Sequence, residues 1–330
     1  MAQVLRTVAV LDRVIPAAGE TAAIDLPVNP LSAIVITLKY LNNTAAPADY
    51  SAISAALAKF TSFNVRYRGA TIFDALSDDM VVLAAGLQKW LPQTGQNNNT
   101  DNDVRALTSA ICFGRRPYDP MECFPATRRG DLILQWIAGA DPTGADNFLL
   151  HVETIELLDA TPQRYLKTTR TARTMTLGDT NDVDLPIGNK LLGLLLKGAT
   201  FPTGASRNAS FSDVRLEVDN VEVMYSRSHW ETLHGELGRW LNPAWGFVEH
   251  VHSVNAAAAG EEDTKQAEND FTLQQQYAYM DLDPMYDGSY ALDTQGAADV
   301  TLGVVSDVAD AAASSVYPIE LVEIAGAAGG

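Results

Sequence analysis

Four short blocks of sequence occur twice in this chain, in the same order, and this repetition limits the possible folds more than any other feature. Each block lies 149 to 164 residues from its counterpart, which is the size of an ordinary domain and too long for a solenoid repeat. We therefore infer that a whole domain was duplicated. The first-half blocks are Ile24–Val28, Val65–Phe73, Asp119–Met121 and Ile155–Leu158, and the second-half blocks are Val183–Ile187, Val214–Val223, Asp283–Met285 and Ile319–Val322.

The repetition also sets the expected domain boundaries. We expect the first unit over residues 1–160 and the second over residues 179–330. The connection 161–178 is basic and has no long apolar face, so we expect it to be a linker.

Short segments with alternating character predict β-strands in both units. Val65 and Tyr67 alternate with arginines, and Val214, Leu216 and Val218 alternate with charged residues. Each segment runs through a turn signal into a second alternating segment, which predicts a hairpin. Short strands, few helices and no βαβ alternation predict an all-β fold, and about eight strands fit each unit. We therefore expect two tandem eight-stranded jelly rolls with short helices in the loops.

A helix-like segment that ends in tryptophan follows each predicted hairpin. The segments 74–90 and 228–240 carry apolar residues at helical spacing, and Ser-Asp-Asp at 77–79 is a predicted cap for the first. We interpret Trp90 and Trp240 as core anchors rather than ligand-stacking residues. Two long polar stretches, 92–116 and 242–282, then occupy corresponding places in the units. We expect both to be surface loops that form one decorated outer face.

The net charge of −18 is unevenly distributed. Residues 1–173 hold 16 Lys+Arg against 17 Asp+Glu, a balance of −1, and residues 174–330 hold 7 against 24, a balance of −17. Phosphates repel a strongly acidic surface, so we expect no direct binding of nucleic acid through the second half. Solubility of an exposed surface explains the charge more simply. No segment has the features of a secretory signal or a membrane span, so we expect the chain to fold in a cytoplasm.

The sequence offers one pair of residues with metal-like spacing, His250 and His252. Tandem barrels occur in two-domain cupin enzymes, whose pattern requires a glycine before the first histidine and a glutamate after the second. Here those positions hold Ala244 and then Ala256 or Ala257, so the pattern fails. No nucleophile elbow or phosphate-binding loop is present either. We therefore predict no catalytic, cofactor-binding or metal-binding residue, and no enzyme.

Several smaller features allow two interpretations. The loops 179–184 and 281–287 are rich in aspartate and could hold a structural Ca²⁺, but they lack EF-hand spacing and solvated turns explain them better. Cys112 and Cys123 are predicted to be packed, reduced thiols. The doublets 115–116 and 128–129, both Arg-Arg, fit either a contact with lipid headgroups or an acidic neighbouring subunit, or two solvated loop ends.

Two fused jelly rolls of this size resemble the double jelly-roll major capsid proteins of tailless icosahedral viruses, which include the adenovirus hexon and the coat proteins of membrane-containing phages. The resemblance covers nearly the whole chain. Its most suggestive element is the hairpin at 65–73 with its helix to Trp90, and the matching hairpin at 214–225 with its helix to Trp240. The absence of long towers favours a compact, phage-type subunit.

This resemblance implies a homotrimer with six barrels and a pseudo-hexagonal outline that tiles a virion capsid assembled in the host cytoplasm. The implied partners are neighbouring capsomers, minor capsid or vertex proteins and an internal viral membrane, without direct contact to nucleic acid. It also implies that residues 1–15 lie near the inner side and that the inserts 92–116 and 242–282 face outward or line trimer contacts.

Two other classes of function stay open, because a fold alone does not fix function. A viral spike or other carbohydrate-binding jelly roll should expose aromatic side chains, with Trp136, Trp230 and Trp245 as the first candidates. A glycan-active enzyme should place two carboxylates about 5–10 Å apart in a cleft.

Overall fold

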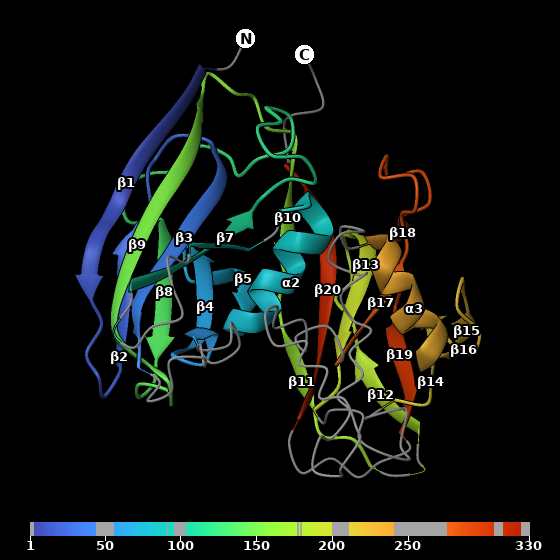
Figure 1. The fold of residues 1–330 in the computed structure, drawn as a ribbon. Helices are drawn as coiled ribbons and strands as arrows, with labels where there is room; N and C mark the ends of the chain where they lie inside the picture. The colour runs from blue at the N-terminus through green and yellow to red at the C-terminus, as the bar shows by residue number, and fades with distance from the viewer. Residues whose placement is uncertain are drawn as a thin grey trace, which may run out of the picture.

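Two β-barrels lie side by side in the computed structural model, with one helix between them (Figure 1). The structure describes residues 3–43, 56–90, 92–95, 102, 104–176, 178, 180–199, 211–240, 276–306 and 313–324.

The first barrel is built from two opposed sheets. One has the strand order β1-β9-β3-β7, extended by β6, and the other has the order β2-β8-β4-β5. The elements are β1 (Gln3–Val14), β2 (Glu20–Asp25), β3 (Leu31–Asn42), β4 (Phe60–Tyr67), β5 (Ala70–Ala75), α2 (Ser77–Gln88), β6 (Gln93–Gly95), β7 (Val104–Cys112), β8 (Leu132–Ala138) and β9 (Ala145–Leu158).

The second barrel repeats this strand order. One sheet runs β17-β13-β20-β10, with β11 also on β20 and β18 on β13, and the other runs β12-β19-β14-β15, with β16 on β14. The elements are β10 (Arg164–Thr168), β11 (Thr171–Arg173), β12 (Thr180–Asp184), β13 (Lys190–Lys197), β14 (Asp213–Val218), β15 (Val221–Glu222), β16 (Ser228–His229), α3 (Trp230–Trp240), β17 (Tyr277–Asp281), β18 (Leu292–Asp293), β19 (Val300–Val305) and β20 (Ser314–Glu323).

Corresponding strands therefore pair in the same way in both halves. The first and last strands of each barrel pair with each other, β1 with β9 and β10 with β20, and β2 pairs with β8 as β12 pairs with β19. This order in two opposed sheets defines a jelly roll. The predicted fold class, two tandem jelly rolls with short helices in the loops, is confirmed.

Matching tight turns close the two predicted hairpins. Arg68 and Gly69 join β4 to β5 with φ of 50° and 85°, and Asp219 and Asn220 join β14 to β15 with φ of 51° and 62°. Positive φ at both central residues matches the twist of the flanking strands, and Gly, Asn and Asp tolerate it best. The predicted helices also form, as α2 and α3.

Each barrel has its own apolar core. The first gathers around Phe63, Val65 and Trp136, and the second around Leu216 and Trp230, all at most 2% exposed. The apolar core of the first barrel also includes residues of the second barrel, because the outer face of the β17-β13-β20 sheet packs against the first barrel. The core of the first barrel therefore continues into the joint between the barrels, whereas the core of the second barrel is a separate cluster.

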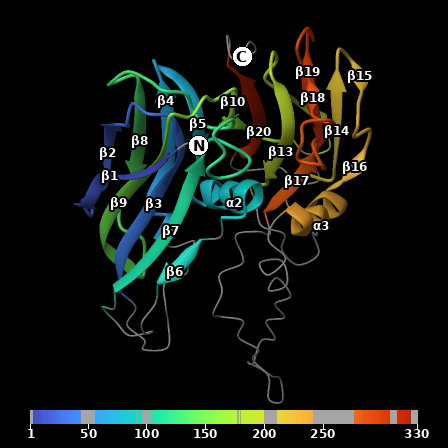
Figure 2. The same ribbon diagram turned by 90° about the horizontal axis from the view of Figure 1, so that it is seen from above.

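The sheets of the two barrels are joined edge to edge. Strand β10 pairs antiparallel with β20 and parallel with β5, through a single bridge between Thr168 and Phe73. A ten-stranded sheet results, in which four strands of each barrel follow one another. Figure 2 shows α2 between the barrels and α3 beside β16 and β17 of the second barrel.

Three stretches differ from the sequence-based expectation. The segment 161–178, for which we expect a linker, contains β10 and β11, both paired with β20; the boundaries 1–160 and 179–330 stay a prediction. The polar inserts are not simply loops. Stretch 92–116 contains β6 and β7, and stretch 242–282 contains β17. Runs of polar residues next to these strands concealed their alternation. The rest of the second insert, 242–275, lies outside the described residues.

The predicted cap of α2 is wrong. The N-cap residue is Leu76, which makes no side-chain capping bond. The hydroxyl of Ser77 instead donates to the Phe60 carbonyl. Asp79 does not cap the helix either, because its carboxylate is buried against the second barrel.

Candidate functional site

The joint between the barrels holds the most elaborate set of buried polar contacts in the described structure. Helix α2 inserts there, and ten of its twelve residues are buried. A helix buried nearly all round must satisfy each of its polar side chains inside the protein. Asp79, which is 0% exposed, is the side chain for which this matters most.

Three residues of the second barrel converge on the Asp79 carboxylate. The hydroxyls of Tyr277 on β17 and Tyr317 on β20 donate to its two oxygens. Lys197 on β13 places its Nζ 2.8 Å from Asp79 Oδ1 and 2.5 Å from Asp78 Oδ2. One carboxylate of the first barrel therefore binds three strands of the second, which fixes how the barrels are oriented.

Burial shifts the pKa values of this cluster. Desolvation, with the Asp78 charge added, raises the pKa of Asp79 to about 6, although Lys197 and Tyr277 partly offset the rise. Desolvation and the Asp79 charge also raise the pKa of both tyrosines well above the ordinary value. Both tyrosines are therefore protonated, and act as hydrogen-bond donors, at neutral pH.

A second network crosses the joint near the opposite end of α2, in the loops after β7 and β17. Arg115 is buried and binds Glu122 of its own barrel, and its Nη1 lies 3.0 Å from Asp283 Oδ2 in the second barrel. Arg164 at the start of β10 also binds Glu122, at 2.7 Å. Burial alone would raise the pKa of Glu122, but the two arginines hold it below its ordinary value.

Trp240 seals the joint with aromatic packing. Its ring stacks on Tyr279 with centroids 4.0 Å apart, and it lies directly over Gly86 of α2. The predicted role of Trp240 as a buried anchor is confirmed, although it anchors the joint rather than a barrel core. Trp90 is half-buried on the outer face of the first barrel, against Ala33, Val35 and Ile155.

The remaining candidate residues do not come together. Asp283 binds Arg115, and Asp281 binds Arg239 at 2.9 Å. The pair His250 and His252 lies outside the described residues. Within the part of the chain that the structure describes, no three His, Cys, Asp or Glu side chains gather as a metal site would require.

The two cysteines and the arginine doublets take different roles. Cys112 and Cys123 are free thiols, and burial raises the pKa of both to about 12. Arg115 is buried in the joint, so neither a lipid contact nor a solvated loop end describes it. Its neighbour Arg116 is exposed, as are both residues of the doublet 128–129.

Two of the three tryptophans proposed to bind carbohydrate are buried. Trp136 is 0% exposed and Trp230 is 2% exposed, and Trp245 lies outside the described residues. No described helix is long and apolar enough to cross a membrane.

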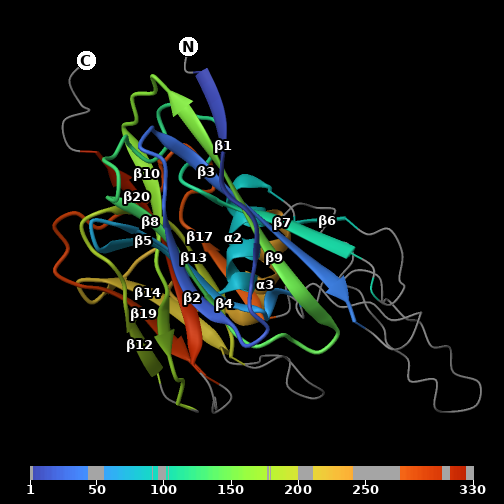
Figure 3. The same ribbon diagram turned by 90° about the vertical axis from the view of Figure 1, so that its left-hand side faces the viewer.

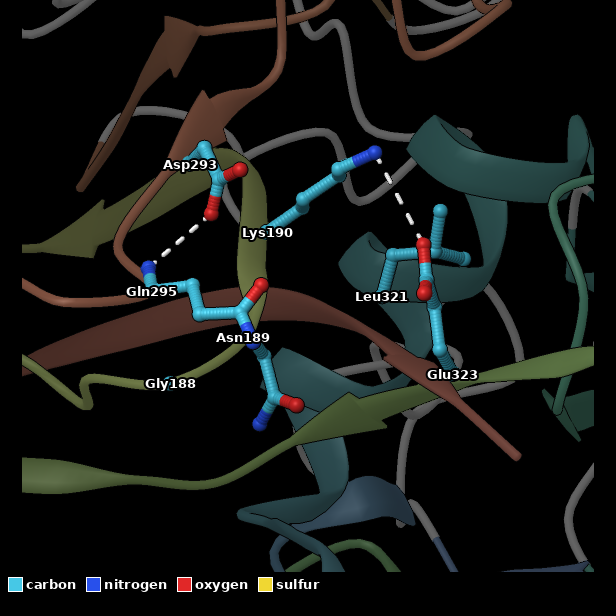
Figure 4. A pocket seen from close by; sticks show the side chains of 7 residues that line it. All are labelled: Gly188, Asn189, Lys190, Asp293, Gln295, Leu321 and Glu323. Atoms are coloured by element: carbon cyan, nitrogen blue, oxygen red, sulfur yellow. Dashed lines mark hydrogen bonds and ion pairs between the residues drawn. The ribbon is translucent and has the colours of Figure 1, made fainter. Parts of the chain in front are cut away.

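One small pocket opens between the β12–β13 turn and the end of β20 (Figure 4). It has a volume of about 210 Å³, and its charged side chains are already engaged. Lys190 lies 3.7 Å from Glu323, and Asp293 accepts the backbone N–H of Gln295 at 2.9 Å. Its lining residues are Gly188, Asn189, Lys190, Asp293, Gln295, Leu321 and Glu323.

Comparison with known proteins identifies the architecture. No protein-family profile matches the sequence, and no curated protein does. The structure of the STIV MCP matches with a TM-score of 0.65 and 13% identity, covering 97% of each chain. The major capsid protein of bacteriophage PM2 matches with a TM-score of 0.58 and 12% identity, covering 98% of this chain and 99% of that one.

A third match comes from PBCV-1 VP54, which was fitted into a reconstruction of the virophage Sputnik. Its TM-score is 0.62 at 8% identity, covering 99% of this chain and 95% of that one. All three matches extend over both barrels and the joint between them. The chain therefore has the double jelly-roll fold of viral major capsid proteins.

Proposed function

We propose that this chain is the major capsid protein of an icosahedral virus and forms pseudo-hexagonal homotrimeric capsomers. The observation that carries the proposal is the rigid joint. Two barrels with the same strand order are fixed side by side by a shared core, a continuous sheet and two buried polar networks. A shell needs subunits of one fixed shape, and the near-full-length match to capsid proteins supports this role.

The proposal extends to location and partners. The protein acts in the virion capsid after assembly in the host cytoplasm, and it contacts neighbouring capsomers, minor capsid or vertex proteins and an internal membrane. It does not bind nucleic acid directly, because the second half carries a balance of −17. We propose domains at 1–160 and 179–330, joined by residues 161–178.

Light scattering coupled to size-exclusion chromatography tests the proposal. We expect light scattering to give the purified protein a mass of three times 35.5 kDa. At high concentration we expect shells or flat arrays in electron micrographs. A monomer at every concentration tested would contradict it. Binding of that monomer to a glycan array would favour the alternative, a viral spike or carbohydrate-binding protein, although the burial of Trp136 and Trp230 speaks against it.

A further inference from the structure

The strand pairing that joins the two barrels occurs once within the chain, although the duplication provides a second pair of corresponding strands. The edge strand β5 of the first barrel pairs with β10, the first strand of the second barrel. By the duplication, the strands that correspond to β5 and β10 are β15 and β1. Among the described residues, β15 pairs only with β14, and β1 pairs only with β9. Each therefore leaves one edge open.

The strand registers identify the residues that correspond to the bridge between Phe73 and Thr168. In the repeated Ile-Glu-Leu block, Ile155 pairs with Arg6 and its counterpart Ile319 pairs with Thr168, so Arg6 on β1 corresponds to Thr168. Phe73 lies four residues after the turn residue Gly69, and Met224 lies four residues after the equivalent turn residue. Met224 therefore corresponds to Phe73.

Exposure differs sharply between the two equivalent places. Phe73, which pairs with Thr168 of the second barrel, is 8% exposed, whereas Met224 is 53% exposed. Val221 on β15 is 63% exposed, and its counterpart Ala70 is exposed as well. The open strand β1 is also apolar on its surface, with Val8 at 51% and Leu11 at 72%. Open edges with large exposed apolar side chains favour pairing with another chain.

The two helices show the same asymmetry. Helix α2 is buried against the second barrel, whereas α3 buries one face and exposes Glu231, Thr232 and Arg239. The registers also place counterparts of the three Asp79 partners on the outer face of the first barrel. These counterparts are the partly exposed residues Thr37, Thr108 and Glu153. Figure 3 looks onto this face, which β1, β9, β3 and β7 cross.

We propose that a second copy of this chain fills both open sides. Strand β15 and helix α3 of one copy dock against β1 and the outer face of the β1-β9-β3-β7 sheet in the next copy. Met224 then lies beside Arg6 of the neighbour. The inference rests on the proposed function and deepens it, because it assigns the contact between subunits to named strands.

Charge supports a contact between unlike barrels. Residues 1–160, which form the first barrel, hold 12 Lys+Arg against 17 Asp+Glu, a balance of −5, and residues 161–330 hold 11 against 24, a balance of −13. A contact between two second barrels would bring together two balances of −13, whereas this contact brings −13 against −5. The surfaces on the two sides differ, so the contact is heterologous and can close into a ring.

Disulfide trapping between copies tests the geometry. Arg6→Cys and Met224→Cys are made in separate, differently tagged full-length chains in which Cys112 and Cys123 are replaced by alanine, and the two chains are co-expressed and oxidised. We expect a disulfide-linked pair that carries both tags, and no linked pair when either variant is expressed alone. Arg6→Cys with Ile187→Cys is the control, since Ile187 is 51% exposed outside the proposed contact. Self-linking of a single variant, or no link in an intact oligomer, would overturn the inference.

Charged substitutions separate this inference from the proposed function. Val8→Glu or Met224→Glu is expected to reduce the mass in light scattering to that of one chain without changing the far-ultraviolet circular dichroism spectrum. Met285→Glu is the matched control, because Met285 is 65% exposed elsewhere, and it should keep the mass of the unmodified protein. If the unmodified chain forms a trimer that both variants retain, the inference is wrong and the proposed function stands. If the unmodified chain is a monomer, both are wrong.

Discussion

Tyr317 of β20 donates its hydroxyl hydrogen to the carboxylate of Asp79 on α2, a residue 238 positions earlier in the chain. Tyr277 of β17 donates to the same carboxylate, and Lys197 completes its surroundings. Because every partner belongs to the other barrel, this single side chain couples the folding of the two units. We expect them to unfold together rather than one after the other.

The stability of the protein should depend on pH through Asp79. Its pKa is about 6 in the folded protein against an ordinary value of 3.8, so the folded state binds this proton more tightly than the unfolded state. The contribution of Asp79 to the free energy of unfolding therefore falls as pH rises from about 4 to about 6, and is constant above that. The total change is about 3 kcal/mol, since one pKa unit corresponds to about 1.4 kcal/mol.

Urea denaturation of Asp79→Asn across this pH range checks the expectation. The difference in unfolding free energy between the unmodified protein and the variant should shrink as pH rises. This trend should be weaker when Asp79→Asn is compared with its parent in an Asp78→Asn background, because the Asp78 charge contributes to the raised pKa of Asp79. Comparing each variant with the unmodified protein cancels the contributions of other carboxylates such as Glu122, whose lowered pKa acts in the opposite direction. A constant difference for Asp79→Asn would contradict the assignment.

Gly86 is required by the ring of Trp240. A Cβ atom at position 86 would overlap that ring, and the ring cannot move away because it stacks on Tyr279. Gly86→Ala is therefore expected to destabilise the protein by about 1–3 kcal/mol, although alanine is the better helix former. Gly235→Ala on α3, where no atom lies within 4 Å, should instead be neutral or stabilise by up to about 1 kcal/mol.

Thermal unfolding of a double variant separates this clash from other effects. If overlap with the Trp240 ring causes the loss of stability, Gly86→Ala should destabilise a Trp240→Leu variant less than it destabilises the unmodified protein. An equal cost in both backgrounds would place the strain elsewhere in α2.

The buried Arg115 should matter far more than its neighbour. Arg115→Met leaves the buried Glu122 and Asp283 carboxylates without this cation, and breaking such a buried pair typically costs about 3–5 kcal/mol. Arg116→Met removes an exposed charge and should change stability by at most about 0.5 kcal/mol. Equal midpoints of urea denaturation for the two variants would show that the network contributes no stability.

The contrast between these adjacent arginines illustrates what the sequence can reveal. Local patterns predict the hairpins, α2 and α3, because alternation and turn residues act over a few positions. The duplication then predicts the two barrels. Nothing local distinguishes Arg115 from Arg116, or marks Asp79 as more than a capping residue, since their partners lie in the other half of the chain.

Lys59 gives the sharpest case of a side chain whose role depends on distant loops. Its fully buried Nζ donates to the carbonyls of Pro16 and Gly139 at 2.8 and 2.9 Å, and it lies 2.6 Å from the Asp141 carboxylate. Lys59→Met would keep the apolar stem but leave a partly buried carboxylate and two carbonyls without their donor, so we expect a loss of about 3–5 kcal/mol. Lys39→Met, which removes a half-exposed ion pair, should cost at most about 1 kcal/mol. The loops that Lys59 binds close one end of the first barrel. Hydrogen exchange in Lys59→Met should therefore accelerate at residues 16–19 and 139–141 before it accelerates elsewhere. Uniform acceleration would show instead that Lys59 supports the whole barrel.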